Sequence, residues 1–193
     1  MISNLYAAIN KRPLSDIEFK YLSAGIDSSK LKKIISNNKH NADNSIIGIV
    51  LAKKAINETF SIPLDEINIC YEQSGRPFIE DHSEIHVSIS HSNDLVVCAV
   101  SNCEIGIDVE KIRQYNPKLA NKYFSNKEIE IICSSYNKDK EFTKIWTQKE
   151  AALKCTGLGI SKLLDTDYFK DFDYHTTEFD DYVITLATKI TEL

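Results

Sequence analysis

Long hydrophobic runs are missing from this sequence, and basic residues are in the minority. No apolar segment of the 193 residues approaches the ~20 that span a bilayer, and residues 1–11 lack the apolar stretch of a signal peptide. Lysine and arginine total 23 against 28 acidic residues, so the basic face of a dedicated nucleic-acid binder is not expected. The five cysteines show no Cys-x-x-Cys spacing, which favours reduced thiols. We therefore expect a cytoplasmic protein with no membrane or nucleic-acid partner.

Hydrophobic patterning predicts helices and strands in separate blocks, in a chain long enough to bury a core. The first block is a strand at 4–9, a segment opened by a Ser15–Glu18 capping box, a helix at 30–35, a polar stretch at 36–44 and a buried helix at 45–52. Gly48 in that helix indicates a close approach to another element. Strands are predicted next, at 67–71, 85–89, 95–100 and 105–110. Helices from Ser125 to about Cys133 and up to Cys155, stopped at Gly157-Leu158-Gly159, lead to strands at 168–174 and 182–188.

Two segments of the chain resemble each other. Residues 87–101 and 173–188 both read as a strand, a polar turn and a second apolar strand. With similar helices in each half, this pattern permits two α+β halves folded as pseudo-repeats. We expect the halves to be residues 1–103 and 104–193, with the active site at their junction.

Two carboxylates share one face of a predicted strand. Successive strand residues point to opposite faces, so Asp108 and Glu110 lie together while Ile107 and Val109 face a core. Like charges this close raise each other's pKa unless a cation lies between them. The pattern indicates half of a site for a hard metal ion.

A third carboxylate falls in the helix that ends at Cys155. At helical spacing Trp146, Glu150 and Lys154 share one ridge, which presents an acid and an ammonium group together. Three carboxylates and a lysine suit Mg²⁺ and a phosphate-bearing substrate.

Taken alone, each feature has an ordinary structural explanation. Exposed strands often carry acids, and a Glu150–Lys154 pair usually decorates a helix surface. A histidine between hydroxyls, as in Ser90-His91-Ser92, is more often part of a turn, and Gly75-Arg76-Pro77 alone is a turn with an incidental arginine.

Together these stretches occur in the order and spacing of one family. They are Arg12-Pro13-Leu14-Ser15, Gly75-Arg76-Pro77, Ser88-Ile89-Ser90-His91-Ser92, Gly106-Ile107-Asp108-Val109-Glu110, Tyr123-Phe124-Ser125 with Glu128, and Trp146 with Lys149-Glu150-Ala151, Lys154 and Gly157-Leu158-Gly159. The chain resembles, over nearly its full length, the surfactin-type 4'-phosphopantetheinyl transferases of the holo-acyl-carrier-protein synthase superfamily.

The resemblance implies a reaction and a metal site. Such enzymes move the phosphopantetheine arm of coenzyme A to a serine of an apo acyl or peptidyl carrier protein and release adenosine 3',5'-bisphosphate. Carried over by position, Asp108, Glu110 and Glu150 would bind Mg²⁺. Glu150 and Lys154 would be the catalytic residues, with Lys154 on the pyrophosphate or the leaving phosphate. We expect a monomer.

The resemblance also implies a set of coenzyme A contacts. They are Arg76, Ser90, His91, Asp108 and Lys154, with Lys32 and Lys39 near positions that meet the 3'-phosphate. Lys30 or Lys33 can take the place of the last two. Asn44 stands where relatives often carry arginine, a departure that concerns adenosine-phosphate binding rather than the reaction.

Some alternatives remain open at the level of sequence. Either Glu150 or a water held near it takes the serine proton. Glu128 is explained equally by its capping box and by a family position near the metal. Two other functions compete: a Mg²⁺-dependent hydrolase that cleaves the pyrophosphate of coenzyme A, and a catalytically silent carrier-binding module, whose expected sign is the loss of one of the three acids.

Overall fold

The first half of the chain is built on a three-stranded antiparallel sheet covered by one long helix. The computed structural model describes residues 2–158, 163 and 168–190, so Gly159 of the predicted helix stop lies outside the described residues. The sheet has the order β1-β5-β4, with β1 at Ser3–Ile9, β4 at His86–Ser92 and β5 at Leu95–Ser101. The predicted strands at 4–9, 85–89 and 95–100 are thus confirmed.

Strand β5 is buried along its whole length because both of its faces are covered. On one face, Cys98 and Val100 pack against α3 (Lys39–Phe60). On the other face, Val97 and Ala99 join a core cluster with strands of the second half. The central strand of the first half is therefore part of the junction between the halves.

Helix α3 begins six residues earlier than predicted. The stretch 39–44 was expected to be a polar loop, but Asn38 caps the helix by accepting a hydrogen bond from the Asn41 amide. Asp43 and Asn44 look like loop residues, yet both are fully buried and find partners in distant segments. At the other end Ser61 adopts a left-handed conformation with φ 59° and stops the helix.

Smaller elements complete the first half. They are α1 (Asp16–Leu22), α2 (Ser28–Ile35) and the two-stranded sheet of β2 (Ile69–Tyr71) and β3 (Pro77–Ile79). The capping box that opens α1 forms as predicted, with Ser15 and Glu18 bonded reciprocally. The short strand β3 was not predicted, because the turn residues Gly75 and Pro77 dominate that stretch.

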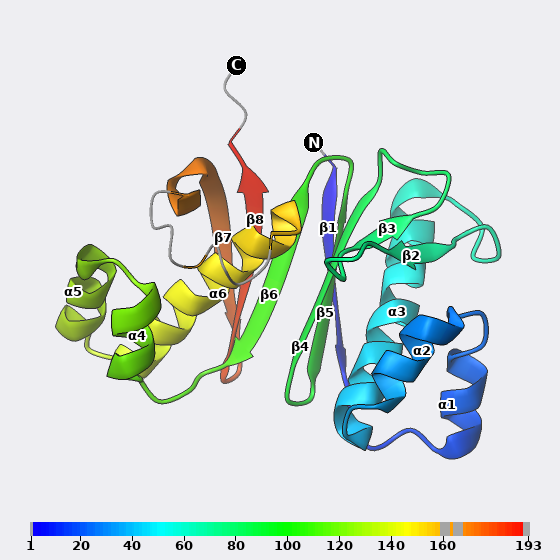
Figure 1. Ribbon diagram of the computed structural model, residues 1–193, viewed down its shortest axis with the longest axis horizontal. Coiled ribbons are helices and arrows are strands. Elements are labelled where there is room, and N and C mark those ends of the chain that lie inside the picture. Colours follow the sequence, from blue (N-terminus) through cyan, green and yellow to red (C-terminus); the bar gives the residue numbers. More distant parts are fainter. Residues whose placement is uncertain (1, 159–162, 164–167, 191–193) are drawn as a thin grey trace.

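The second half repeats the plan of the first. Its sheet has the order β6-β8-β7, and α6 packs across it as α3 does in the first half (Figure 1). In each sheet the second strand of a hairpin lies in the middle, paired with an earlier strand of the chain. This repetition confirms the predicted α+β fold of two similar halves.

The remaining elements of the second half are as follows: β6 (Ile105–Lys111), α4 (Pro117–Tyr123), α5 (Asn126–Ser134), α6 (Lys138–Thr156), the 3₁₀ turn η2 (Tyr168–Asp171), β7 (Phe172–Phe179) and β8 (Tyr182–Lys189). The predicted strand over 168–174 is wrong at its start, because Tyr168–Asp171 forms the 3₁₀ turn and buries Phe169. The capping box of α5, with Ser125 and Glu128, is confirmed.

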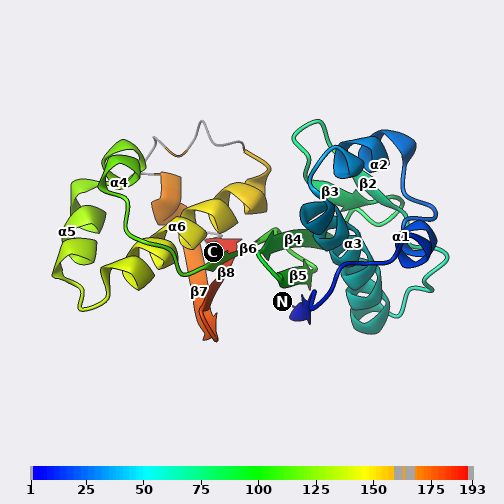
Figure 2. The same cartoon turned by 90° about the horizontal axis from the view of Figure 1, so that it is seen from below.

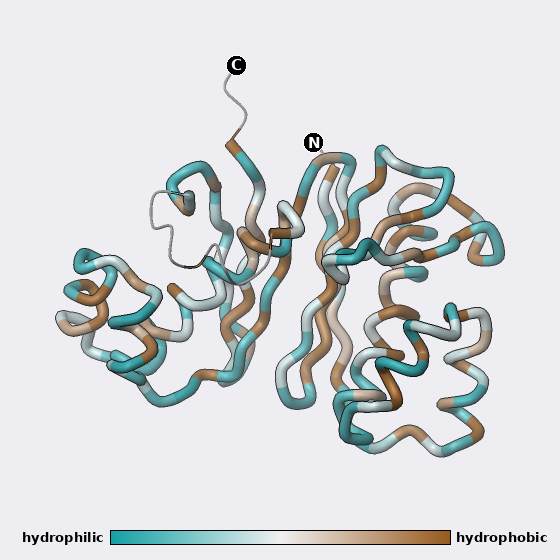
Figure 3. Tube along the Cα trace, viewed as in Figure 1, coloured by the Kyte–Doolittle hydropathy of each residue, from teal (hydrophilic) through white to brown (hydrophobic). Residues whose placement is uncertain are grey.

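The two halves meet along β4, β5 and β6, which lie side by side in both orthogonal views (Figures 1 and 2). Hydrophobic colour runs along these central strands, while the outer loops are mostly hydrophilic (Figure 3). Over the described part of the chain, no helix combines the length and apolar character needed to cross a membrane.

Candidate active site at the junction of the two halves

Three serines of β4 attach the first half to β6 of the second. They alternate along the strand, so their side chains share one face. Backbone amides of β6 donate to their hydroxyls, as follows: Ile107 N to Ser88 Oγ at 3.0 Å, Val109 N to Ser90 Oγ at 3.4 Å and Lys111 N to Ser92 Oγ at 3.1 Å. We call these three residues the serine seam. It stands in place of a backbone ladder between two sheets.

Gly106 lets α6 lie directly on β6. A Cβ atom at this position would come within 1.9 Å of the Ala151 carbonyl oxygen and 2.5 Å of the Cys155 amide nitrogen. Only a residue without a side chain permits this backbone-to-backbone approach. The contact brings Glu150 and Lys154 of α6 to the acids of β6.

Asp108 is the centre of the resulting cluster. It is 4% exposed, and its Oδ1 accepts from Ser90 Oγ at 2.8 Å and from Lys154 Nζ at 2.7 Å. Lys154 Nζ also donates to Ser90 Oγ at 2.8 Å. The three residues, from β4, β6 and α6, form a closed triangle of charge-assisted hydrogen bonds.

Burial and the charge of Asp108 both raise the pKa values of Glu110 and Glu150. Burial raises the pKa of Glu110, and repulsion by Asp108 adds to the rise. The same two causes, in the same order, raise the pKa of Glu150. Lys154 and Arg113 oppose the rise at both carboxyl groups. The three acids are thus electrostatically coupled and incompletely neutralised.

The residues present fit a hard cation. Asp108 Oδ2 is buried and has no hydrogen-bond partner among the described residues, although an orphaned carboxylate oxygen is costly. Carboxylate oxygens are the ligands that Mg²⁺ prefers. No three acidic, histidine or cysteine side chains within the described ranges are already gathered around one metal position, so the acids do not form a preassembled cage.

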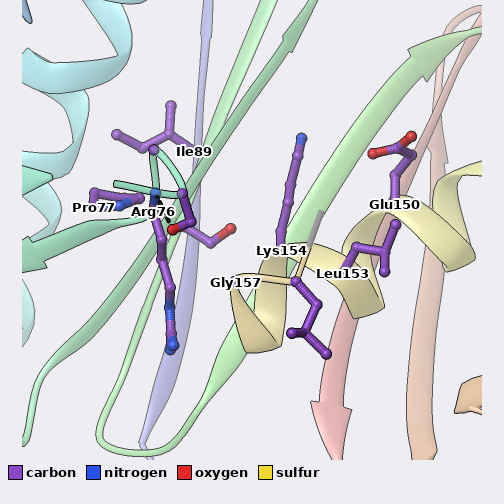
Figure 4. Close-up of a pocket in the computed structure, with 11 residues that line it drawn as sticks. Arg76, Pro77, Ile89, Glu150, Leu153, Lys154 and Gly157 are labelled. Carbon is purple, nitrogen blue, oxygen red and sulfur yellow. Dashed lines mark hydrogen bonds between the residues drawn. The ribbon is translucent and has the colours of Figure 1, made fainter. Parts of the chain in front are cut away.

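A groove of about 260 Å³ opens beside the cluster. Its walls come from both halves, with Arg76, Pro77 and Ile89 on one side and Glu150, Leu153, Lys154 and Gly157 on the other (Figure 4). Arg76 is near Glu104, with 4.0 Å between Nη1 and Oε1. The groove therefore offers two cations on facing walls, which suits an anionic ligand that lies between the halves.

His91 lies near the cluster but is not among the residues that line the groove. Burial lowers its pKa, and repulsion by Lys154 and His40 lowers it further. A neutral imidazole is thus favoured at neutral pH. Its predicted contact with coenzyme A stays a prediction.

The lysines proposed to meet the 3'-phosphate differ in exposure and in their partners. Lys32 is exposed on α2, whereas Lys39 pairs with the fully buried Asp43. Lys30 Nζ lies 3.6 Å from the centre of the Tyr71 ring. Neither Lys32 nor Lys39 lines the groove, and their predicted role at a 3'-phosphate stays a prediction.

Asn44 is fully buried and serves a structural contact. It accepts from Asn10 Nδ2 at 2.8 Å and donates to the Asn93 carbonyl oxygen at 2.6 Å. It therefore holds the turn between β4 and β5. This buried contact suits the short amide of Asn44 at a position where relatives often carry arginine.

Glu128 combines its capping role with an ion pair. One carboxylate oxygen accepts from Ser125, and the other lies 3.0 Å from Nζ of Lys149, whose side chain is 2% exposed. The capping interpretation of Glu128 is confirmed. The ion pair fastens α5 to α6, and Lys149 also lies over the Phe169 ring of η2 at 4.1 Å.

Sequence reasoning missed Arg113 as a residue of this region. Its guanidinium lies 4.8 Å from the Trp146 ring, on the ridge of α6 that leads to Glu150. Nε and Nη2 of Arg113 are buried without a hydrogen-bond partner in the described chain. Its position three residues beyond Glu110 was a usable signal, because a nearby cation can offset the repulsion between acids, and Arg113 does oppose the rise in pKa at Glu110 and Glu150.

Comparison of the sequence with known proteins identifies the family. A family model described as the 4'-phosphopantetheinyl transferase superfamily matches residues 104–189, and one described as 4'-phosphopantetheinyl transferase, N-terminal, matches residues 13–103. The chain is 30% identical over 166 residues to the 4'-phosphopantetheinyl transferase Sfp of Bacillus subtilis, an alignment that covers 84% of this chain and 74% of the relative. The chain belongs to the 4'-phosphopantetheinyl transferase superfamily.

Other members of the superfamily match shorter parts. The 4'-phosphopantetheinyl transferase gsp of Aneurinibacillus migulanus is 32% identical over 145 residues, which cover 74% of this chain and 60% of the relative. HetI of Nostoc is 39% identical over 106 residues, which cover 51% of this chain and 45% of the relative. The alignments thus span roughly half to three quarters of the lengths of these superfamily members.

Proposed function

We propose that the chain is a 4'-phosphopantetheinyl transferase that moves the phosphopantetheine arm of coenzyme A to a serine of an apo acyl or peptidyl carrier protein. The observation that carries the proposal is the contact of Lys154 with Asp108, 2.7 Å long, beside a buried carboxylate oxygen that has no hydrogen-bond partner among the described residues. This contact adjoins a groove between two halves whose sequences match the superfamily's family models.

The chemistry requires that a pyrophosphate be neutralised while its bond breaks. The serine oxygen of the carrier forms a bond to the phosphorus next to pantetheine while the pyrophosphate bond breaks. The other phosphate of the pyrophosphate leaves as the 5'-phosphate of adenosine 3',5'-bisphosphate. Asp108, Glu110 and Glu150 would hold Mg²⁺, which supplies charge neutralisation at the phosphate oxygens when bound. Lys154 adds a positive charge that reaches the same groove.

The first-half residues would hold the rest of coenzyme A. Arg76 faces the groove and presents a forked donor group suited to a phosphate. Ser90 reaches the site through Asp108 and Lys154. His91, Lys32 and Lys39 would extend these contacts toward the adenosine phosphates.

The base that accepts the serine proton is the least constrained element. Glu150 lines the groove, so its carboxylate lies where the carrier serine would have to enter. We assign it this role either directly or through a bound water.

We further propose a division of labour between residues 1–103 and 104–193, a cytoplasmic location and a monomeric state. In this division the first segment supplies coenzyme A contacts and the second supplies the metal site and the carrier surface. The repeated sheet order supports the division, since each segment contains one complete sheet and its covering helix.

Product accounting distinguishes transfer from hydrolysis. The chain is incubated with coenzyme A, Mg²⁺ and an apo carrier protein, and the amounts of adenosine 3',5'-bisphosphate and of modified carrier are compared. The proposal requires equal amounts and no release when the carrier is omitted. Release without the carrier would instead support a hydrolase, and an unchanged carrier with unchanged coenzyme A would support a binding module.

A further inference from the structure

The hydroxyls of the serine seam have their donor directions fixed by their neighbours. A serine hydroxyl has one proton to donate and two lone pairs that accept. At Ser92 the Lys111 amide donates into one lone pair at 3.1 Å, which leaves the proton free for another acceptor. That acceptor is Glu110 Oε2, at 3.1 Å from Ser92 Oγ. One serine of the first half thus holds an acid of the second.

The backbone around Ser92 is itself held from several sides. The carbonyl oxygen of Asn93, the next residue, accepts from Asn44 Nδ2 at 2.6 Å. Beyond it, the Asp94 carbonyl accepts from the Asn10 amide at 2.7 Å, and the Asp94 amide donates to the Tyr182 hydroxyl at 3.4 Å. The first strand, the long helix and the second half therefore fix this turn. These contacts fix the backbone from which the Ser92 side chain projects toward Glu110.

Ser88 provides a contrast at the other end of the seam. It makes the same kind of contact with β6, by accepting from the Ile107 amide at 3.0 Å. No hydrogen bond joins it to a carboxylate in the described chain. Comparing Ser88 with Ser92 thus separates the attachment of β6 from the orientation of an acid.

We propose that Ser92 is a positioning residue that orients the Glu110 carboxylate for metal binding, so that the first half of the chain shapes a metal site whose ligands belong to the second. This inference rests on the proposed function, because it takes Glu110 as a ligand of Mg²⁺. Outer partners that orient metal ligands typically change metal affinity by about 10- to 100-fold when removed.

The test measures Mg²⁺ binding without turnover. Mg²⁺ is titrated by calorimetry into the protein saturated with coenzyme A, with no carrier present, for the wild type and for Ser92→Ala, Ser92→Thr and Ser88→Ala. We expect Ser92→Ala to bind Mg²⁺ about tenfold more weakly. Ser92→Thr retains the hydroxyl and should bind like the wild type, and Ser88→Ala should keep its Mg²⁺ affinity despite losing a seam contact.

A double-mutant cycle with Glu110→Gln checks the route of the effect. If Ser92 acts through Glu110, then Ser92→Ala adds no further loss of Mg²⁺ affinity in the Glu110→Gln background. Should Ser92→Ala fail to fold cooperatively, Ser92→Cys preserves the volume and offers only a weak donor, so its Mg²⁺ affinity should fall between the two limits.

The outcomes separate the inference from the proposed function. Absence of Mg²⁺ binding by the wild type would contradict the metal site itself. Normal binding by the wild type together with equal affinities for Ser92→Ala and Ser88→Ala would overturn the role of Ser92 alone. Equal affinity of the wild type and Ser92→Cys would overturn it as well.

Discussion

Gly106→Ala is expected to push α6, which carries Glu150 and Lys154, away from β6, which carries Asp108 and Glu110. The new methyl group would lie 1.9 Å from the Ala151 carbonyl oxygen and 2.5 Å from the Cys155 amide nitrogen. Heavy atoms in good contact are about 3.5 Å apart. The clash is with backbone atoms, so no side-chain rotation relieves it, and α6 must withdraw from β6 by about 1.5 Å.

This displacement sets the size of the effect. Overpacking of this kind costs about 3 kcal/mol of folding stability. A misplacement of about 1 Å in a catalytic group lowers the rate by about 100-fold, and here Glu150 and Lys154 move together. Urea denaturation gives the free energy of unfolding, and the rate of adenosine 3',5'-bisphosphate release at low substrate gives kcat/KM for the same preparation.

Gly48→Ala is the matched control. Its methyl group would meet Ile89 Cγ2 at 2.7 Å, which is a side-chain atom that moves when the isoleucine changes rotamer. Alanine also favours the helix over glycine by about 1 kcal/mol. We expect Gly48→Ala to keep α6 in place and to lose far less kcat/KM than Gly106→Ala, because only the Ile89 side chain in the groove wall must shift. Wild-type kcat/KM in a folded Gly106→Ala protein would refute the claim that this contact positions the catalytic residues.

Three further predictions concern charged residues. Lys154→Met leaves the buried Asp108 without its 2.7 Å partner and should lower the free energy of unfolding by about 2 kcal/mol, less than for a fully buried pair because the Lys154 side chain is 33% exposed. Adding Asp108→Asn to this variant should recover most of the loss in urea denaturation. An additive loss would contradict the pairing. The pKa of Glu150 is raised in the folded state, so its ionised form opposes folding above the unfolded pKa, and stability rises as pH falls through the interval between the folded and unfolded pKa values. Glu150→Gln should therefore be more stable than the wild type at pH 7, lack this acid-side gain and transfer no phosphopantetheine; a less stable variant would contradict the sign. Loss of Lys32 or Lys39 should weaken binding of coenzyme A but not of 3'-dephospho-coenzyme A, and equal losses for both ligands would refute a contact with the 3'-phosphate.

Local sequence patterns predicted most of the helices and strands, because helix caps and strand alternation depend on residues only a few positions apart. The capping boxes at Ser15 and Ser125 depend on residues three positions apart, and both form. Alternation in β6 placed Asp108 and Glu110 on one face, and Gly48 does approach a neighbouring strand at Ile89. These features need no knowledge of distant contacts.

The start of α3 was mispredicted because its partners are distant in sequence. Asp43 accepts from the Leu14 amide and Asn44 from Asn10, and these contacts bury two polar residues that read as a loop. A buried polar residue is stable only when hydrogen-bonded. Such partners are visible only after the chain has folded.

Only part of the serine seam could be predicted, because its partners are also distant in sequence. Hydroxyls at alternate positions of β4 were apparent in the sequence as Ser88, Ser90 and Ser92. Their acceptance of amides from β6, which belongs to a different sheet, depends on how the halves pack. The sequence thus named Asp108, Glu150 and Lys154, which the structure brings together, but not Arg113. The contacts that orient these residues required the structure.

The central claim is tested most directly by intact-protein mass spectrometry of apo carrier proteins. Each carrier is incubated with the chain, coenzyme A and Mg²⁺, with and without a chelator, and in parallel with Asp108→Asn. The account predicts a mass gain of one phosphopantetheine arm on the carrier serine, which chelator and Asp108→Asn both abolish. A carrier that gains the arm equally well in chelator or with Asp108→Asn would contradict the proposed metal site, and no gain on any apo carrier would contradict the proposed function.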